Sequence, residues 1–93
     1  MNKVNNTLQQ RHQTYGDYSD QAEIAQQLKG VMRETRNWYA MTNVQRESLE
    51  MIASKISRIL NGDPHHTDSW HDIGGYARLV EDRIIDMAIP PVL

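Results

Sequence analysis

Cysteine is absent from this 93-residue sequence, and no long apolar run or cluster of basic residues is present. Without cysteine, disulfide bonds, thiolate metal sites and cysteine nucleophiles are all excluded. The apolar stretches are far shorter than a membrane span, and the Asn-rich start does not resemble a signal peptide. A net charge of −2 lacks the electrostatic footprint of a general nucleic-acid binder. We therefore expect a cytoplasmic protein that binds neither membranes nor nucleic acids in general.

Phenylalanine is also missing, and only 39% of the residues are hydrophobic. A chain of this length buries roughly 60–65% of its unfolded surface, which gives a modest core. We expect residues 1–93 to form a single domain. Because helices with an uncovered apolar stripe need something to pack against, we also expect the chain to form a homo-oligomer.

Three segments have apolar residues at helical spacing, and no segment has a convincing strand pattern. The apolar positions are Ile24, Leu28, Val31 and Met32 in the segment 21–36; Leu49, Ile52, Ile56 and Ile59 in the next; and Ile73, Ala77, Val80, Ile84 and Met87 in the last. Thr42 with Gln45 three residues later fits a capping box, and Asn61-Gly62 followed by Pro64 fits a helix stop. The sequence predicts an all-α fold, a small bundle of three main helices completed by oligomerisation. Residues 1–14 are expected to be partly disordered or a short helix, and 89–93 an extended apolar tail that docks on a partner.

Glycines interrupt two of these helical patterns, at Gly30 and at Gly74-Gly75. Because glycine lowers helix propensity by about 1 kcal/mol relative to alanine, we expect a neighbouring helix close to Gly30. At Gly74-Gly75 we expect a close neighbour that is either backbone or a ligand. Gly16, between Tyr15 and Asp17, predicts a turn, and we expect Ser19 or Asp20 to cap the helix that follows.

Opposite charges flank the short connection 61–67. Lys55 and Arg58 lie three residues apart on the helix before it, and Asp68 and Asp72 lie four apart on the helix after it. A connection of this length makes the two helices antiparallel neighbours, which brings the cations near the carboxylates. The arrangement is either an ion-pair latch or half of a site for a metal-bound phosphate.

Carboxylates and histidines are the remaining candidates for chemistry. Glu47 and Glu50 form an ExxE pattern, and such carboxylates facing Asp68 and Asp72 could hold Mg²⁺, although they lie in the early turns of their helix. His65, His66 and His71 surround Asp68 but favour an ordinary polar turn over a metal site. His66 is a candidate general base or phosphate contact. Trp70 and Tyr76 are favoured as core or interface aromatics.

The motifs YGDY, KISRIL and DSWHDIGGYARL, in this order between Tyr15 and Leu79, resemble those of a family of small, uncharacterised phage and prophage proteins. More remotely, the chain is similar to the all-α MazG-like nucleoside-triphosphate pyrophosphohydrolases, which are oligomeric and Mg²⁺-dependent. The resemblance implies a polar pocket made of Tyr15, Asp17, Lys55, Arg58, Asp68, Asp72 and Tyr76. The sequence departs from those enzymes in its second motif, which is DxxxD where theirs is ExxD.

Two functions follow as hypotheses. In the first, the chain binds a nucleotide phosphate and is a catalyst or a binding protein only. Asp68 and Asp72 would hold Mg²⁺, Lys55 and Arg58 would neutralise the phosphate, Tyr15, Asp17 or Tyr76 would contact the substrate, and His66 would be the catalytic base. In the second, it is a non-catalytic phage accessory protein that binds a host or phage protein, and the charged residues form a latch.

Overall fold

The computed structural model describes the backbone of residues 3–88 and the side chains of residues 7–87. The described part contains four α-helices and one 3₁₀ turn: α1 Lys3–Tyr15, α2 Tyr18–Arg33, η1 Trp38–Ala40, α3 Asn43–Asn61 and α4 Thr67–Ala88. It contains no strand, so the all-α prediction is confirmed. The expected tail 89–93 lies outside the described residues. None of the described helices is long and apolar enough to cross a membrane.

The helix α1 has 13 residues, more than the short helix expected within residues 1–14. The helix α2 begins at Tyr18, and its N-cap is Asp17, whose side chain accepts a hydrogen bond from the backbone N–H of Asp20. The prediction that Ser19 or Asp20 would cap this helix is wrong, because the chain becomes helical directly after the glycine turn. The helix also ends at Arg33, three residues before the expected end.

The start of α3 follows the predicted capping box. The Thr42 side chain accepts from the backbone N–H of Gln45 at 3.1 Å, and the Gln45 side chain accepts from the backbone N–H of Thr42 at 2.9 Å. Two of the otherwise unpaired N–H groups of the first turn are thereby satisfied. The helix ends at Asn61 and Gly62, as the stop signal predicts, and α4 begins at Thr67.

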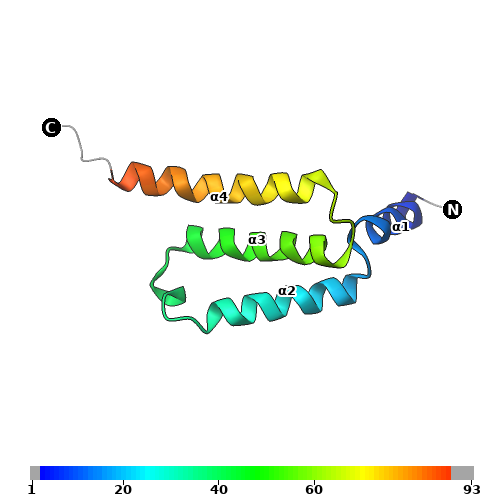
Figure 1. Ribbon diagram of the computed structural model, residues 1–93, viewed down its shortest axis with the longest axis horizontal. Helices are drawn as coiled ribbons and strands as arrows, with labels where there is room; N and C mark the ends of the chain where they lie inside the picture. Colours follow the sequence, from blue (N-terminus) through cyan, green and yellow to red (C-terminus); the bar gives the residue numbers. More distant parts are fainter. Residues whose placement is uncertain (1–2, 89–93) are drawn as a thin grey trace.

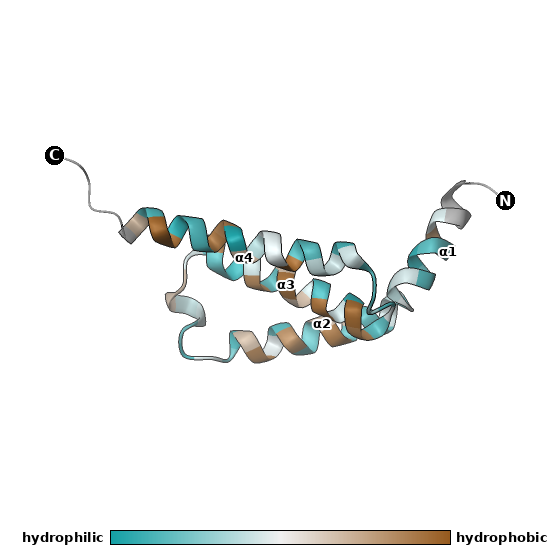
Figure 2. Cartoon of the chain, turned by 45° about the horizontal axis from the view of Figure 1, so that its top comes forward, coloured by the Kyte–Doolittle hydropathy of each residue, from teal (hydrophilic) through white to brown (hydrophobic). Residues whose placement is uncertain are grey.

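Three of the helices form one layer, with α3 between α2 and α4 (Figure 1). Each neighbour runs antiparallel to α3, and α1 projects from the end of the layer at which α3 passes into α4. Apolar segments recur along all three helices of the layer (Figure 2). The molecule is elongated, with its longest extent at 63 Å.

The corner between α1 and α2 is fixed to the end of α3. The Asn61 side-chain amide donates to the backbone carbonyls of Tyr15 at 2.9 Å and Asp17 at 2.8 Å, and Asp63 N–H donates to the carbonyl of Thr14 at 2.7 Å. Gly16, in the turn that the sequence predicts, has a φ of +78°, and a Cβ there would overlap Asn61. These contacts join two segments more than 40 positions apart in the sequence.

Few hydrophobic side chains are fully covered in the described chain. The buried ones are Ala25, Trp38 and Ala53, with Trp38 only 5% exposed. Ser48 and Ser57 are buried on α3 as well, so the central helix approaches its neighbours through small residues. Several positions of the predicted apolar stripes remain open, among them Leu49, Ile84 and Met87.

The three helical glycines do not have the close neighbours that the sequence led us to expect. Apart from the chain neighbours and nearby backbone of the same helix, no atom lies within 4 Å of where a Cβ would be at Gly30, Gly74 or Gly75. A close contact within the described part of the chain is therefore not the reason for these glycines.

Candidate functional site

The connection between α3 and α4 folds back as the spacing predicts and brings Lys55 to Asp72. Lys55 Nζ lies 2.9 Å from Asp72 Oδ2. The lysine side chain is only 13% exposed, while the carboxylate is 40% exposed. The pair therefore sits at the edge of the α3–α4 seam, with the cation on the inner side.

This ion pair perturbs the acidity of the carboxylate. The hydrogen bond donated by Lys55 holds the pKa of Asp72 below its ordinary value of 3.8, and the positive charges of Lys55, His71 and Arg58 act in the same direction. Partial desolvation opposes them. Asp72 is accordingly ionised at neutral pH, and its charge is already paired.

Arg58 does not reach either aspartate in an ion pair and instead lies over an aromatic ring. Its guanidinium carbon is 4.7 Å from the centroid of the Tyr15 ring. The ring of His66 meets the same tyrosine edge-on, with centroids 5.6 Å apart. Arg58 Nε is buried and has no hydrogen-bond partner. A cation over a tyrosine face is worth about 0.5–2 kcal/mol, and this contact does not supply a hydrogen-bond partner for Arg58 Nε.

A second arginine, Arg11 of α1, also approaches this tyrosine, with its guanidinium carbon 5.2 Å from the ring centroid. We call Tyr15, Arg58, His66 and Arg11 the Tyr15 cluster. A surface hollow of about 240 Å³ adjoins Arg11 and Tyr15 of this cluster, around the corner between α1 and α2. The hollow is lined by Leu8, Arg11, His12, Tyr15, Gly16, Asp17, Tyr18 and Gln21. The cluster thus places two permanent positive charges and one imidazole around one aromatic ring.

The other predicted site residues lie outside this cluster. Asp17 lines the hollow, but its side chain caps α2. Asp68 is 82% exposed, and its Oδ2 is 4.0 Å from His66 Nε2. Tyr76 lies with Asp72 in a shallow depression of about 370 Å³ on α4. The structure therefore gathers Tyr15, Arg58 and His66, pairs Lys55 with Asp72, and leaves Asp68 at the surface.

The carboxylates and histidines do not gather into a metal site. Among the described residues, no three side chains of the His, Cys, Asp and Glu types lie close enough to hold an ion. Asp72 is occupied by Lys55, and Glu50 is paired with Arg33 at 3.1 Å. The predicted Mg²⁺ ligands Asp68 and Asp72 are thus not part of a three-ligand cluster among the described residues, and a site completed by phosphate oxygens stays a prediction.

Comparison with known sequences identifies the family. Residues 1–84 match a family described as a domain of unknown function, DUF6378. The chain belongs to this family. No curated protein and no solved structure matches the chain. The DUF6378 match covers all the motifs from Tyr15 to Leu79 and every residue of the Tyr15 cluster.

Sequence reasoning about this DUF6378 chain missed two residues of the site. Arg11 lies one helical turn before Tyr15, so a helix that continues to Tyr15 would have placed both on one face. Asn61 was interpreted only as a helix stop, yet its side-chain amide holds the corner that carries Tyr15. No local pattern signals that second role, because its partners are backbone carbonyls far away in the sequence.

Proposed function

We propose that this DUF6378 protein binds the phosphate of a nucleotide at the Tyr15 cluster, in the cytoplasm of a phage-infected cell. The observation that carries the proposal is that two arginines, Arg58 and Arg11, lie over the ring of Tyr15, and that Arg58 Nε has no hydrogen-bond partner. Arginine presents several N–H donors in a fixed plane, a geometry that matches phosphate oxygens.

The neighbouring residues supply the rest of a phosphate site. His66, when protonated, adds a third donor on the same tyrosine, and the hollow beside Arg11 gives the remainder of a nucleotide a place to lie. Lys55 is held by Asp72 and contributes its charge from a distance. In this proposal Tyr15 keeps the guanidinium groups in position and His66 contacts the phosphate.

We propose binding in preference to hydrolysis. The similarity to MazG-like enzymes supports a nucleotide ligand, but hydrolysis in those proteins depends on Mg²⁺, for which the described side chains offer no three-ligand site. We therefore derive no catalytic step, and any Mg²⁺ would arrive with the nucleotide.

The test is ligand-dependent stabilisation measured by thermal unfolding, with each deoxynucleoside triphosphate and with pyrophosphate, in the presence and absence of Mg²⁺. At ten times the Kd, binding stabilises the fold by about 1.4 kcal/mol, a rise of roughly 6–11 °C for a domain of this size. Arg58→Gln should abolish the rise.

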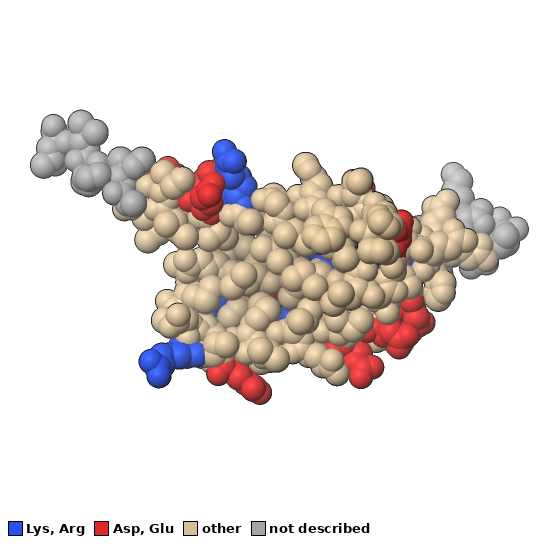
Figure 3. All heavy atoms as spheres, in the orientation of Figure 1, with Lys and Arg blue, Asp and Glu red and all other residues tan. Residues whose placement is uncertain are grey.

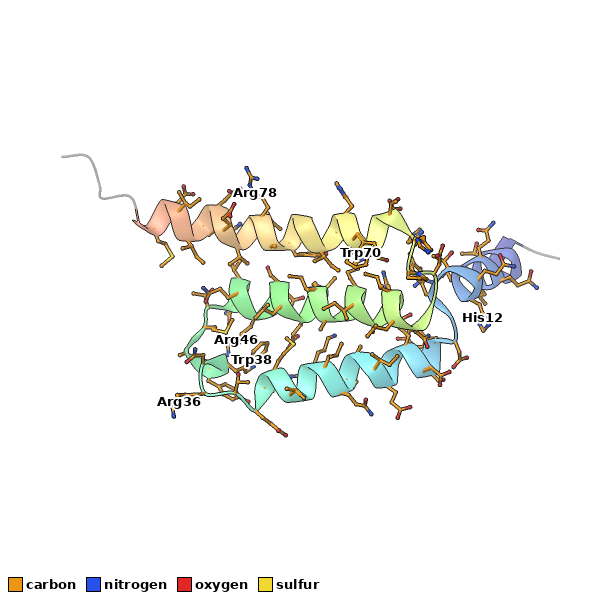
Figure 4. All side chains as sticks on the ribbon, viewed as in Figure 1. His12, Arg36, Trp38, Arg46, Trp70 and Arg78 are labelled. Carbon is orange, nitrogen blue, oxygen red and sulfur yellow. The ribbon has the colours of Figure 1, made fainter. Side chains whose placement is uncertain are left out.

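Arg78→Gln is the matched control. Arg78 points away from the layer on the outer side of α4 (Figure 4), and its ion-pair partners among the described residues are Glu81 and Asp82. This variant should keep the full response to nucleotide. The absence of any shift in the wild-type protein at millimolar nucleotide would refute the proposal. Release of pyrophosphate by the wild-type protein would show instead that the site is catalytic.

A second function, that of a phage accessory protein that binds a host or phage protein without catalysis, is favoured by the closed Lys55–Asp72 pair. A latch of this kind leaves Asp72 unavailable to a ligand. The thermal-shift assay above distinguishes the two functions, since this one predicts no response to nucleotide. Asp72→Asn tests the latch itself, because loss of a latch partner lowers the melting temperature by leaving the covered lysine unpaired. Loss of a ligand-binding carboxylate would leave the melting temperature unchanged or raise it.

A further inference from the structure

The seam between α3 and α4 carries an open apolar groove along the first half of α3 and the second half of α4. Two adjoining hollows of about 250 and 350 Å³ form it, and both include Gln45 and Val80. The apolar side chains that line it are Met41, Val44, Leu49, Ile52, Ala77, Val80, Ile84 and Met87. On the face of the molecule drawn in Figure 3, the most exposed charged side chains lie at the edges.

Most of these residues belong to the apolar positions that the sequence predicts along α3 and α4, which would form the core of a helical bundle. In the single chain they stay open, with Ile84 49% and Met87 78% exposed. A layer of helices becomes stable by covering its apolar side with a second layer. Few hydrophobic side chains of the described residues are fully buried. These residues form one layer of helices, and no second layer among them covers its apolar side.

The exposed surface indicates how much cover is missing. The chain exposes 7150 Å², whereas a folded monomer of its 10.8 kDa mass exposes about 5500 Å². Part of the excess belongs to α1, which extends from the layer (Figure 1). Half of this excess surface equals the roughly 800 Å² that each partner buries in a stable interface.

We infer that the groove is covered by the same groove of a second copy of the chain, in a twofold dimer. If the fold needs a cover over this groove, the covering molecule must be available wherever the chain is made. A second copy of the chain always meets that condition. The charges agree, because the groove is rimmed by one cation, Arg83, and one anion, Asp86. Since a twofold interface brings one patch against itself, a neutral rim avoids repulsion between like charges. The α3–α4 pairs of two copies would then form a four-helix bundle.

Sedimentation equilibrium tests this dimer. The wild-type protein should have twice the chain mass at micromolar concentration, and its melting temperature should rise with protein concentration, since association stabilises only the folded state. Leu49→Glu places a charge in the groove and should weaken association at least 100-fold.

Leu79→Glu is the matched control. Leu79 is 48% exposed on α4 and lies beside Asp72 and Tyr76, outside the groove. This variant should remain dimeric. If Leu49→Glu unfolds while Leu79→Glu stays folded and dimeric, the inference stands, because a chain that needs its second layer cannot fold alone. A wild-type monomer at 100 µM with a concentration-independent melting temperature would overturn it, as would equal association of the two variants.

Discussion

Replacement of Asn61 by alanine removes the side chain that joins the corner between α1 and α2 to the end of α3. Its amide donates two hydrogen bonds, at 2.9 Å to the carbonyl of Tyr15 and at 2.8 Å to the carbonyl of Asp17. Each hydrogen bond in a folded protein contributes about 0.5–1.5 kcal/mol net. Asn61→Ala should therefore lower the free energy of unfolding by about 1–3 kcal/mol.

Urea and thermal unfolding, followed by far-UV circular dichroism at one fixed protein concentration, measure this loss. For a domain of this size, each kcal/mol corresponds to about 4–8 °C in melting temperature, so a fall of at least 4 °C is expected. Because the same amide holds the corner that places Tyr15 over Arg58, the variant should also reduce the stabilisation by nucleotide proposed above.

Asn37→Ala is the matched control, since Asn37 precedes η1 and its side chain makes no capping hydrogen bond. Its stability should stay within about 0.5 kcal/mol of the wild type. Equal stability of Asn61→Ala and the wild-type protein would refute the argument that the corner depends on this amide.

Two further predictions concern the caps and charges of the layer. Thr42→Ala should destabilise the fold by about 1 kcal/mol, because it removes the side-chain acceptor of the α3 capping box; unchanged urea midpoints would contradict this role. Since the pKa of Asp72 is lowered in the folded state, its ionised form stabilises the fold at pH values above 3.8, and this contribution is lost as the pH falls below 3.8. Wild-type protein should thus exceed Asp72→Asn in stability at pH 7 and lose that advantage in acid, as urea titrations at several pH values can measure; a difference independent of pH would contradict the ion pair.

Most of the helical architecture could be predicted from local patterns. The capping box at Thr42 and the stop at Asn61-Gly62 each depend on residues close together in sequence, and the structure has both. The start of α2 was misplaced because Asp17, Ser19 and Asp20 are all good N-caps, and only the turn geometry at Gly16 selects among them.

The candidate site was predictable only in part. Spacing alone brings Lys55 near Asp72, since both lie close to one short connection between antiparallel helices. It could not show that Arg58 would turn to Tyr15 in preference to Asp68, because that contact depends on the long-range docking of the corner through Asn61. Arg11 belongs to the site for the same reason.

The position of α3 between two neighbours has a consequence for how this sequence can vary. Small side chains lie buried along it at Ser48, Ala53 and Ser57, and a larger residue at any of them would push a neighbouring helix outward. The outer helices α2 and α4 each have a side without a neighbouring helix of the layer, so they can shift to accommodate a larger residue there. The helix α3 has a neighbour on both sides and cannot shift in this way. Divergence within DUF6378 should accordingly be narrowest in side-chain volume along this one helix.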